Sequence, residues 1–134
     1  MIAVIQRCSQ GKVAVSDKVV GEISHGLVIL LGVQKNDTEN DAEFLVNKIC
    51  GLRIFNDEND KMNLSIKDVN GSALVISQFT LCGDTKKGRR PSFIKAATPD
   101  DGNRLYEYFM SEIKKGRDTR PFSLINVMLS YSIF

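Results

Sequence analysis

The chain has 134 residues, of which 43% are hydrophobic and 25% are charged, and its formal net charge at pH 7 is only +2. This length allows one domain with a moderate core and excludes two independent ones. The small charge excludes strong attraction of the whole protein to nucleic acid, and no apolar run approaches the ~20 residues that cross a bilayer. We therefore expect a single domain over residues 1–134 that enters no membrane, with any affinity for polyanions confined to a local patch.

The first residues and the cysteines indicate the compartment. Met1-Ile2-Ala3-Val4 starts directly with a strand pattern and lacks the basic and apolar regions of a secretory signal. Cys8, Cys50 and Cys82 are odd in number and lack the paired spacing of metal ligands, which indicates reduced thiols in strands or core. We expect a cytoplasmic protein that uses no metal and no cofactor.

Strand patterns dominate the first third of the chain. Residues 2–7 and 12–16 are predicted to be strands, Asp17-Lys18 a turn, and residues 19–24 the returning strand. The next run, residues 27–33, is apolar throughout. A strand without polar alternation is buried on both faces, so this one is expected at the centre of the sheet.

The first helix is expected to begin at Thr38, because a threonine followed three residues later by Asp41 resembles a capping box. Its apolar positions recur at helical spacing in Ala42, Leu45, Ile49 and Leu52. The helix should end near Gly51 and cover one face of the sheet. The polar residues 56–61 lack the mid-loop glycine and terminal glutamate of a calcium-binding loop, so they are interpreted as a turn.

A second helix is expected after Thr98, a capping residue followed by Pro99 at the first helical position. Its apolar stripe consists of Leu105, Tyr108, Phe109 and Ile113. Gly116 is a natural end for this helix. Residues 124–134 then have the pattern of a final strand that completes the sheet.

A short polar motif between the two helices is the most informative part of the chain. Ala73-Leu74-Val75-Ile76 is predicted to be a buried strand, and Ser77-Gln78-Phe79-Thr80-Leu81 follows where that strand reaches the surface. A basic, glycine-containing loop over residues 82–93 comes next. Backbone amides and polar side chains at a strand end can stabilise a reacting oxyanion, and nearby cations suit a phosphate-bearing substrate. The sequence therefore predicts a reaction site at this strand end.

The Ser-Gln-Phe-Thr-Leu motif resembles the signature of the D-aminoacyl-tRNA deacylases, also called the D-tyrosyl-tRNA deacylase family, and the similarity extends from Met1 to about Lys115. Three further segments carry it: Ile5-Gln6-Arg7, Gly51-Leu52-Arg53-Ile54-Phe55 and Lys87-Gly88-Arg89-Arg90-Pro91-Ser92-Phe93. The resemblance implies an α/β domain in which two α-helices cover a mixed, largely antiparallel, barrel-like β-sheet, and it implies a homodimer. The implied activity is hydrolysis of the ester that joins a D-amino acid, or glycine mischarged on tRNA-Ala, to the terminal adenosine of tRNA.

The resemblance also implies a set of site residues. In the catalytic set, the amides of Phe79 and Thr80 would stabilise the oxyanion, and the Thr80 hydroxyl would position substrate or water. Ser77 and Gln78 would orient the terminal adenosine. The residues expected to bind substrate or tRNA are Arg7, Leu81, Lys86, Lys87, Arg89, Arg90 and Phe93.

The residues themselves leave simpler interpretations open. A hydroxyl nucleophile needs an adjacent base, and His25, the only histidine, is distant in sequence and has the pattern of a surface loop residue, so we favour hydrolysis by water over covalent catalysis. Thr80 could be a strand residue that satisfies a neighbouring backbone group. The cations of residues 86–95 could be a solvated loop, although the resemblance favours contacts with tRNA phosphates.

The end of the chain departs from the family. Relatives continue after their second helix with a Gly-Pro element that reaches into the partner's pocket and rejects L-amino acids, whereas residues 117–134 contain no Gly-Pro pair. A shifted reading frame, a natural truncation or a divergent end would each produce this difference. Two functions remain: an active deacylase, which the intact motif favours, or a catalytically impaired relative that binds tRNA ends or only dimerises.

Overall fold

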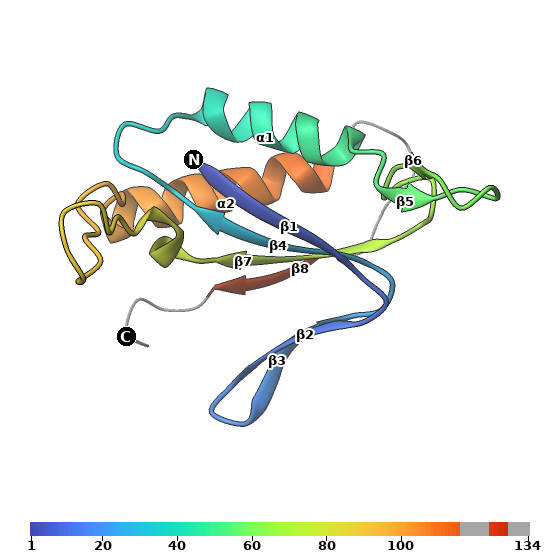
Figure 1. The fold of residues 1–134 in the computed structure, drawn as a ribbon, viewed down its shortest axis with the longest axis horizontal. Helices are drawn as coiled ribbons and strands as arrows, with labels where there is room; N and C mark the ends of the chain where they lie inside the picture. The colour runs from blue at the N-terminus through green and yellow to red at the C-terminus, as the bar shows by residue number, and fades with distance from the viewer. Residues whose placement is uncertain (116–123, 129–134) are drawn as a thin grey trace.

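The computed structural model describes residues 1–115 and 124–128. Four of the described strands form one sheet in the order β1-β4-β7-β8. These strands are β1 (Ile2–Cys8), β4 (Gly26–Gly32), β7 (Ser72–Ser77) and β8 (Leu124–Met128). Helices α1 (Glu39–Gly51) and α2 (Pro99–Lys115) cover one face of this sheet (Figure 1).

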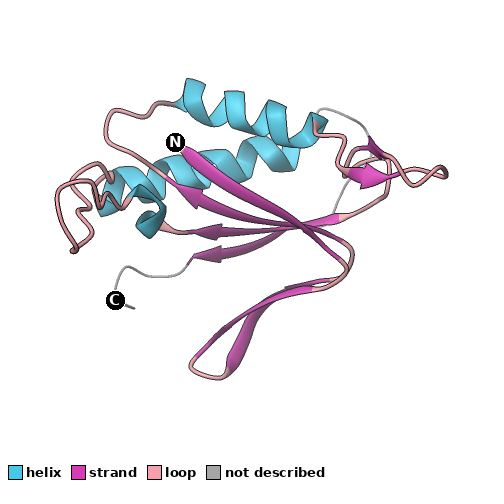
Figure 2. Ribbon diagram, viewed as in Figure 1, coloured by secondary structure: helices cyan, strands magenta, loops and turns pink. Residues whose placement is uncertain are grey.

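Two antiparallel hairpins extend from the sheet (Figure 2). β2 (Gly11–Val15) and β3 (Lys18–Ile23) form the longer hairpin, which bends away on the side opposite the helices. β5 (Phe55–Asn56) and β6 (Met62–Leu64) form the shorter one. The turn between β2 and β3 contains two residues with positive φ, Ser16 and Asp17, one position earlier than the predicted turn.

The central sheet is mixed, as predicted, but two of its three pairings are parallel. β1 runs antiparallel to β4, whereas β7 runs parallel to both β4 and β8. The connections between the parallel strands pass through α1 and α2, and a helical crossover returns the chain to the edge where the previous strand began. The description "largely antiparallel" therefore holds for the hairpins and not for this sheet. Within the described residues the sheet is open and does not close into a barrel.

The core lies between the sheet and the two helices. Leu27, Ile29 and Leu31 of β4 point into it, as do Ala73 and Val75 of β7. The alternate residues of both strands are apolar as well and belong to a second cluster on the other face. Burial on both faces explains the unbroken apolar runs in these two strands, which predicted their central position.

Both helix starts form as predicted. The Thr38 amide donates to the Asp41 carboxylate at 2.8 Å, and the Asp101 amide donates to the Thr98 hydroxyl at 3.3 Å. These bonds satisfy amides that have no acceptor within the helix. The turn at residues 56–61 is also confirmed, because the Asp57 carboxylate accepts the amides of Asn59 and Lys61 at 2.8 and 3.1 Å.

The apolar stripes of the helices are shifted slightly from the prediction. In α1 the buried residues are Ala42, Val46 and Ile49, and in α2 they are Gly102, Leu105, Tyr106, Phe109, Met110 and Ile113. Tyr106 was not predicted to be buried; its hydroxyl donates to the Val75 carbonyl at 3.0 Å, which satisfies its one polar atom inside the core. Tyr108 was expected in the stripe but lies half-buried at its edge, where its hydroxyl donates to Glu43 of α1.

The final strand is confirmed over Leu124–Met128, where β8 pairs in parallel with β7. The remaining predictions for the end of the chain, the helix end at Gly116 and the strand beyond residue 128, lie outside the described residues. Among residues 1–115 and 124–128, no helix is both long enough and apolar enough to cross a membrane.

Gly26 offers a test of the parallel pairing that organises the fold. A Cβ at this position would lie 1.8 Å from the carbonyl oxygen of Ser72, its partner on β7. We predict that Gly26→Ala lowers the free energy of unfolding by roughly 2–4 kcal/mol, because the two backbones must separate. Urea denaturation monitored by circular dichroism measures this change.

Gly51→Ala is the matched control. A Cβ on Gly51, the last residue of α1, has nothing within 4 Å. We expect that substitution to change stability by less than about 1 kcal/mol, in the stabilising direction, because alanine favours the helix. Equal effects of the two substitutions would contradict the close approach of β4 and β7.

Candidate active site

The predicted motif lies where β7 leaves the sheet. The Gln78 amide donates to the Leu31 carbonyl at 2.8 Å, which is the last bond between the two central strands. β4 ends at Gly32, and the chain beyond Gln78 pairs with no further strand among residues 1–115 and 124–128; it folds into the 3-10 helix η1 (Phe79–Cys82). The predicted strand end is confirmed at Ser77, but the interpretation of Thr80 as a strand residue is wrong.

Gln78 and Thr80 contact each other through their side chains. The side-chain nitrogen Nε2 of Gln78 donates to the Thr80 hydroxyl oxygen, and both residues are half-buried. A hydroxyl oxygen that accepts a hydrogen bond still has its own proton to donate. Gln78 therefore fixes the orientation of the Thr80 hydroxyl and leaves it able to donate to another group.

The backbone at the start of η1 presents amide groups. Phe79 and Thr80 are the first two residues of this helix, so their amides lie where the chain leaves β7. The later amides are used internally: Leu81 donates to the Gln78 carbonyl at 3.3 Å and Gly83 to the Thr80 carbonyl at 3.1 Å. Amides at such a position can stabilise an oxyanion without a charged side chain.

Close packing holds η1 against β4. A Cβ on Gly32 would lie 3.1 Å from the Leu81 Cβ and 3.2 Å from the Gln78 carbonyl oxygen, so glycine permits this approach. Cys82, the last residue of η1, is buried, and its thiol donates to the Val33 carbonyl at 3.6 Å. Burial raises the pKa of the Cys82 thiol, so this cysteine stays protonated at neutral pH and serves packing, as predicted.

The basic loop is anchored beside the motif. Asp84 and Ser92 pair through two backbone hydrogen bonds of 2.8 and 2.7 Å, which close the loop between them. Phe93, the next residue, places its ring edge-on to the Phe79 ring, with centroids 5.3 Å apart. The structure thus brings Phe93 into contact with the motif and fixes where the loop leaves it.

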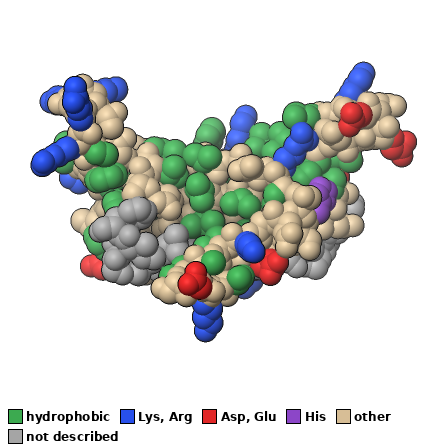
Figure 3. All heavy atoms as spheres, turned by 60° about the horizontal axis from the view of Figure 1, so that its bottom comes forward, with side chains coloured by type: hydrophobic (Ala, Val, Ile, Leu, Met, Phe, Trp, Pro, Cys, Tyr) green, Lys and Arg blue, Asp and Glu red, His purple; other side chains and the backbone are tan. Residues whose placement is uncertain are grey.

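The cations of the loop are exposed. Lys86, Lys87, Arg89 and Arg90 form no ion pair with any described residue. Lys95 differs, because its ammonium pairs with the Asp84 carboxylate at 3.1 Å. The Lys86 amide, followed by Lys95, lowers the pKa of Asp84, so this carboxylate stays ionised at neutral pH. Lysine and arginine side chains gather at this end of the molecule (Figure 3).

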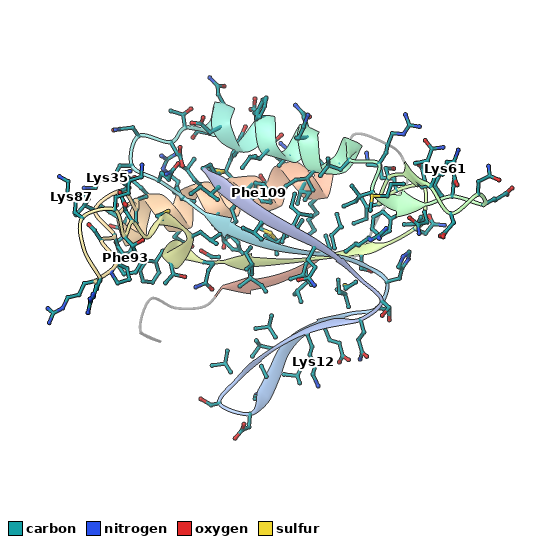
Figure 4. All side chains as sticks on the ribbon, in the orientation of Figure 1. Lys12, Lys35, Lys61, Lys87, Phe93 and Phe109 are labelled. Carbon is teal, nitrogen blue, oxygen red and sulfur yellow. The ribbon has the colours of Figure 1, made fainter. Side chains whose placement is uncertain are left out.

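Sequence patterns missed one cation in this region, Lys35. It follows β4, and its amide donates to the Lys95 carbonyl at 2.9 Å, next to the bridge between Gln34 and Ala96. Lys35, Lys87 and Phe93 lie at one end of the molecule (Figure 4). Parallel strands end at the same edge of a sheet, so a prediction that β4 and β7 are parallel would have placed Lys35 near Ser77.

Arg7 lies away from the other predicted site residues. Arg7 pairs with Leu27, whereas Ser77 pairs with Leu31, so they are four residues apart along β4, or about 13 Å. The Arg7 guanidinium donates to the Ile54 carbonyl at 2.7 Å and to the Asn56 side chain at 3.1 Å. Within one chain, Arg7 is not part of the cluster formed by the motif and the basic loop.

His25 lies at the same end of the sheet as Arg7. It is exposed, as predicted, and its ring packs edge-on against Phe55 with centroids 5.1 Å apart. A cavity of about 370 Å³ lies between His25 and Arg7. This cavity contains no residue of the motif, so we do not assign the proposed reaction to it, although Ser9 and Arg7 line it.

Comparison with known proteins identifies close relatives. A family model described as D-Tyr-tRNA(Tyr) deacylase matches residues 4–125. A D-aminoacyl-tRNA deacylase from Thermotoga petrophila is 56% identical over 115 residues, which cover 86% of this chain and 77% of the relative. A protein of the same name from Yersinia enterocolitica is 55% identical over 115 residues, which cover 86% of this chain and 79% of the relative.

Two solved structures have a similar fold. One, titled c-Myc DNA Unwinding Element Binding Protein, superposes with a TM-score of 0.82 at 32% identity and covers 91% of this chain and 82% of that one. The other is titled as a probable eukaryotic D-amino acid tRNA deacylase, with a TM-score of 0.70 at 21% identity. It covers 84% of this chain and 66% of that one, and at this identity it supports the fold alone.

Proposed function

The chain belongs to the D-Tyr-tRNA(Tyr) deacylase family, and from this premise we propose that it hydrolyses the ester bond of D-aminoacyl-tRNA. The products are the free D-amino acid and tRNA, so the reaction removes wrongly charged tRNA before translation uses it. The observation that carries the proposal is the intact segment Ser77–Leu81, folded so that its first η1 amides lie beside the basic loop. Glycine mischarged on tRNA-Ala presents the same ester and is a second candidate substrate.

The reaction needs a water molecule, an oxyanion site and a proton acceptor. Water adds to the ester carbonyl carbon, and the developing oxyanion accepts hydrogen bonds from the amides of Phe79 and Thr80. One such donor stabilises a transition state by about 3 kcal/mol. The bond to the ribose oxygen then breaks, and the proton lost by the water ends on that oxygen, with the neighbouring ribose hydroxyl as carrier. No cofactor takes part in this scheme.

The other predicted residues bind and orient the substrate. Ser77 and Gln78 contact the terminal adenosine, and Leu81 and Phe93 form apolar walls beside it. Lys86, Lys87, Arg89 and Arg90 contact backbone phosphates, which suits exposed cations that form no ion pair with a carboxylate of the described residues. This role for the loop agrees with its anchoring to the motif through Phe93 and Phe79.

We further propose that the protein is a two-fold homodimer with the motif close to the interface. β1 is an edge strand of the sheet, and Val4 on it is 46% exposed. Val19 and Val20 on the β2–β3 hairpin are 47% and 44% exposed. Hydrophobic side chains gather on the face opposite the helices (Figure 3), and a second copy would cover them. Arg7 lies about 13 Å along the sheet from Ser77, so it would reach a motif only in the site of such a second copy.

The dimer is tested by its mass in solution. We predict that light scattering at micromolar concentration gives about twice the mass of one chain. Val19→Asp should shift this equilibrium towards monomer, because it places a charge in the buried apolar interface. Glu22→Ala, on the same hairpin, is the control. A stable monomer of the unmodified chain would contradict the proposal.

The alternative function is a catalytically impaired relative that binds tRNA ends or only dimerises. The relatives of high identity favour the hydrolase instead. We predict that the chain deacylates D-aminoacyl-tRNA faster than the uncatalysed reaction, measured with matched D- and L-tyrosyl-tRNA. Because residues 117–134 contain no Gly-Pro pair, we also expect weak discrimination between the two esters. Binding of tRNA without hydrolysis of either ester would favour the alternative.

A substitution at Thr80 separates hydrolysis by water from covalent catalysis. If backbone amides stabilise the oxyanion and the Thr80 hydroxyl only positions a group, Thr80→Ala should lower kcat by less than about tenfold. Removal of a true nucleophile costs roughly a millionfold. Single-turnover measurements with D-tyrosyl-tRNA distinguish these results, and Thr85→Ala in the exposed loop is the matched control. Loss to the uncatalysed rate in a folded Thr80→Ala variant would mean that the hydroxyl reacts directly.

A further inference from the structure

Lys35 lies on a turn that is fixed by backbone contacts. Its amide donates to the Lys95 carbonyl at 2.9 Å, and two residues earlier the Val33 carbonyl accepts the Ala97 amide at 3.0 Å. The next residue, Asn36, adopts a left-handed conformation with φ of 68°, which ends the turn. The segment that leaves the basic loop is therefore bound directly to the segment that leaves β4.

These two segments border an open, shallow hollow of about 360 Å³. Its lining residues are Gln34, Lys35, Asn36, Ile94 and Lys95. Two ammonium groups and two side-chain amides are donors for an anion, and Ile94, which is 72% exposed, offers an apolar surface beside them. The hollow begins one residue after Phe93, which contacts Phe79 of the motif.

The charges around the hollow are predominantly positive. The Asp37 carboxylate binds the Met1 ammonium at 2.8 Å and accepts a hydrogen bond from the backbone amide of Gln34 at 2.7 Å. The Asp84 carboxylate binds Lys95 at 3.1 Å and the Lys86 amide at 2.9 Å. Lys35 has no carboxylate within 4.0 Å among the described residues. Both carboxylates are thus occupied, and the Lys35 ammonium is available to an external anion.

We propose that this hollow binds a backbone phosphate of the tRNA acceptor strand, with Lys35 as the main contact and Lys95 as the second. The inference rests on the proposed function, because that function places the terminal adenosine at the motif. Lys95 is two residues beyond Phe93, on a turn that the Ala96 amide closes by donating to the Phe93 carbonyl at 3.0 Å. Two residues span at most about 7 Å, so an RNA strand that leaves the motif reaches the hollow directly. The proposal extends the row of phosphate contacts from the cations of the basic loop to the turn after β4.

Binding of uncharged tRNA by the full chain tests the phosphate contact independently of hydrolysis. Lys35→Ala should weaken binding about threefold to tenfold and reduce the slope of log affinity against log salt by about 0.7–0.9, as expected for one lost phosphate contact. Lys35→Arg should retain the slope, and Lys35→Glu should weaken binding further. Lys61→Ala is the matched control, because Lys61 is also exposed, forms no ion pair with a described residue and lies at the opposite end of the molecule (Figure 4).

Hydrolysis measurements then separate this inference from the proposed function. Lys35→Ala should raise KM for D-tyrosyl-tRNA with little change in kcat, and it should leave hydrolysis of D-tyrosyl-adenosine unchanged, because that ester carries no upstream phosphate. Equal salt slopes for Lys35→Ala and Lys61→Ala would overturn the inference even if the chain is an active deacylase. Absence of hydrolysis by the unmodified chain would overturn the proposed function, while the binding experiment would still decide the role of Lys35.

Discussion

The hydrogen bond from the Gln78 amide to the Leu31 carbonyl sets the position of the whole candidate site. It is the last hydrogen bond between the parallel strands β4 and β7, and both strands end at this edge of the sheet. The segment after β7 turns into η1 and the basic loop. The segment after β4 turns through Lys35 towards α1. The topology explains why residues that are more than 40 positions apart in the sequence converge, since parallel neighbours end on the same side.

The candidate site is proposed to act mainly through backbone amides, and this determines which side chains matter around it. Gly32 lets η1 approach β4, and the buried thiol of Cys82, the last residue of η1, donates to the Val33 carbonyl. Phe93 contacts Phe79 from the far side and keeps the loop next to the motif. These residues need no reactivity; they hold the amides of η1 in place. Electrostatic preorganisation of this kind suits an ester substrate, whose carbonyl develops negative charge as water attacks.

Local patterns predicted most of the fold, and non-local pairing accounts for what they missed. The capping threonines, the apolar runs of the two central strands and the polar turn after Phe55 depend on neighbours in sequence, and the structure confirms them. Periodicity selected Tyr108 for the core, but Tyr106 is buried because the Val75 carbonyl offers its hydroxyl a partner. The parallel pairing, the 3-10 helix at Thr80 and the position of Lys35 all depend on which strands become neighbours, which no local pattern specifies.

The same reasoning separates Arg7 from the rest of the predicted site. Arg7 stands at one end of the sheet, held by the Ile54 carbonyl and Asn56, whereas the motif is at the other. Within one chain the two ends stay apart, because four residues along β4 span about 13 Å at the rise of a β-strand. An arginine that serves the motif must therefore come from another copy of the chain. Contact of Arg7 with the motif therefore depends on the two-fold dimer, and evidence against the dimer would separate Arg7 from the motif.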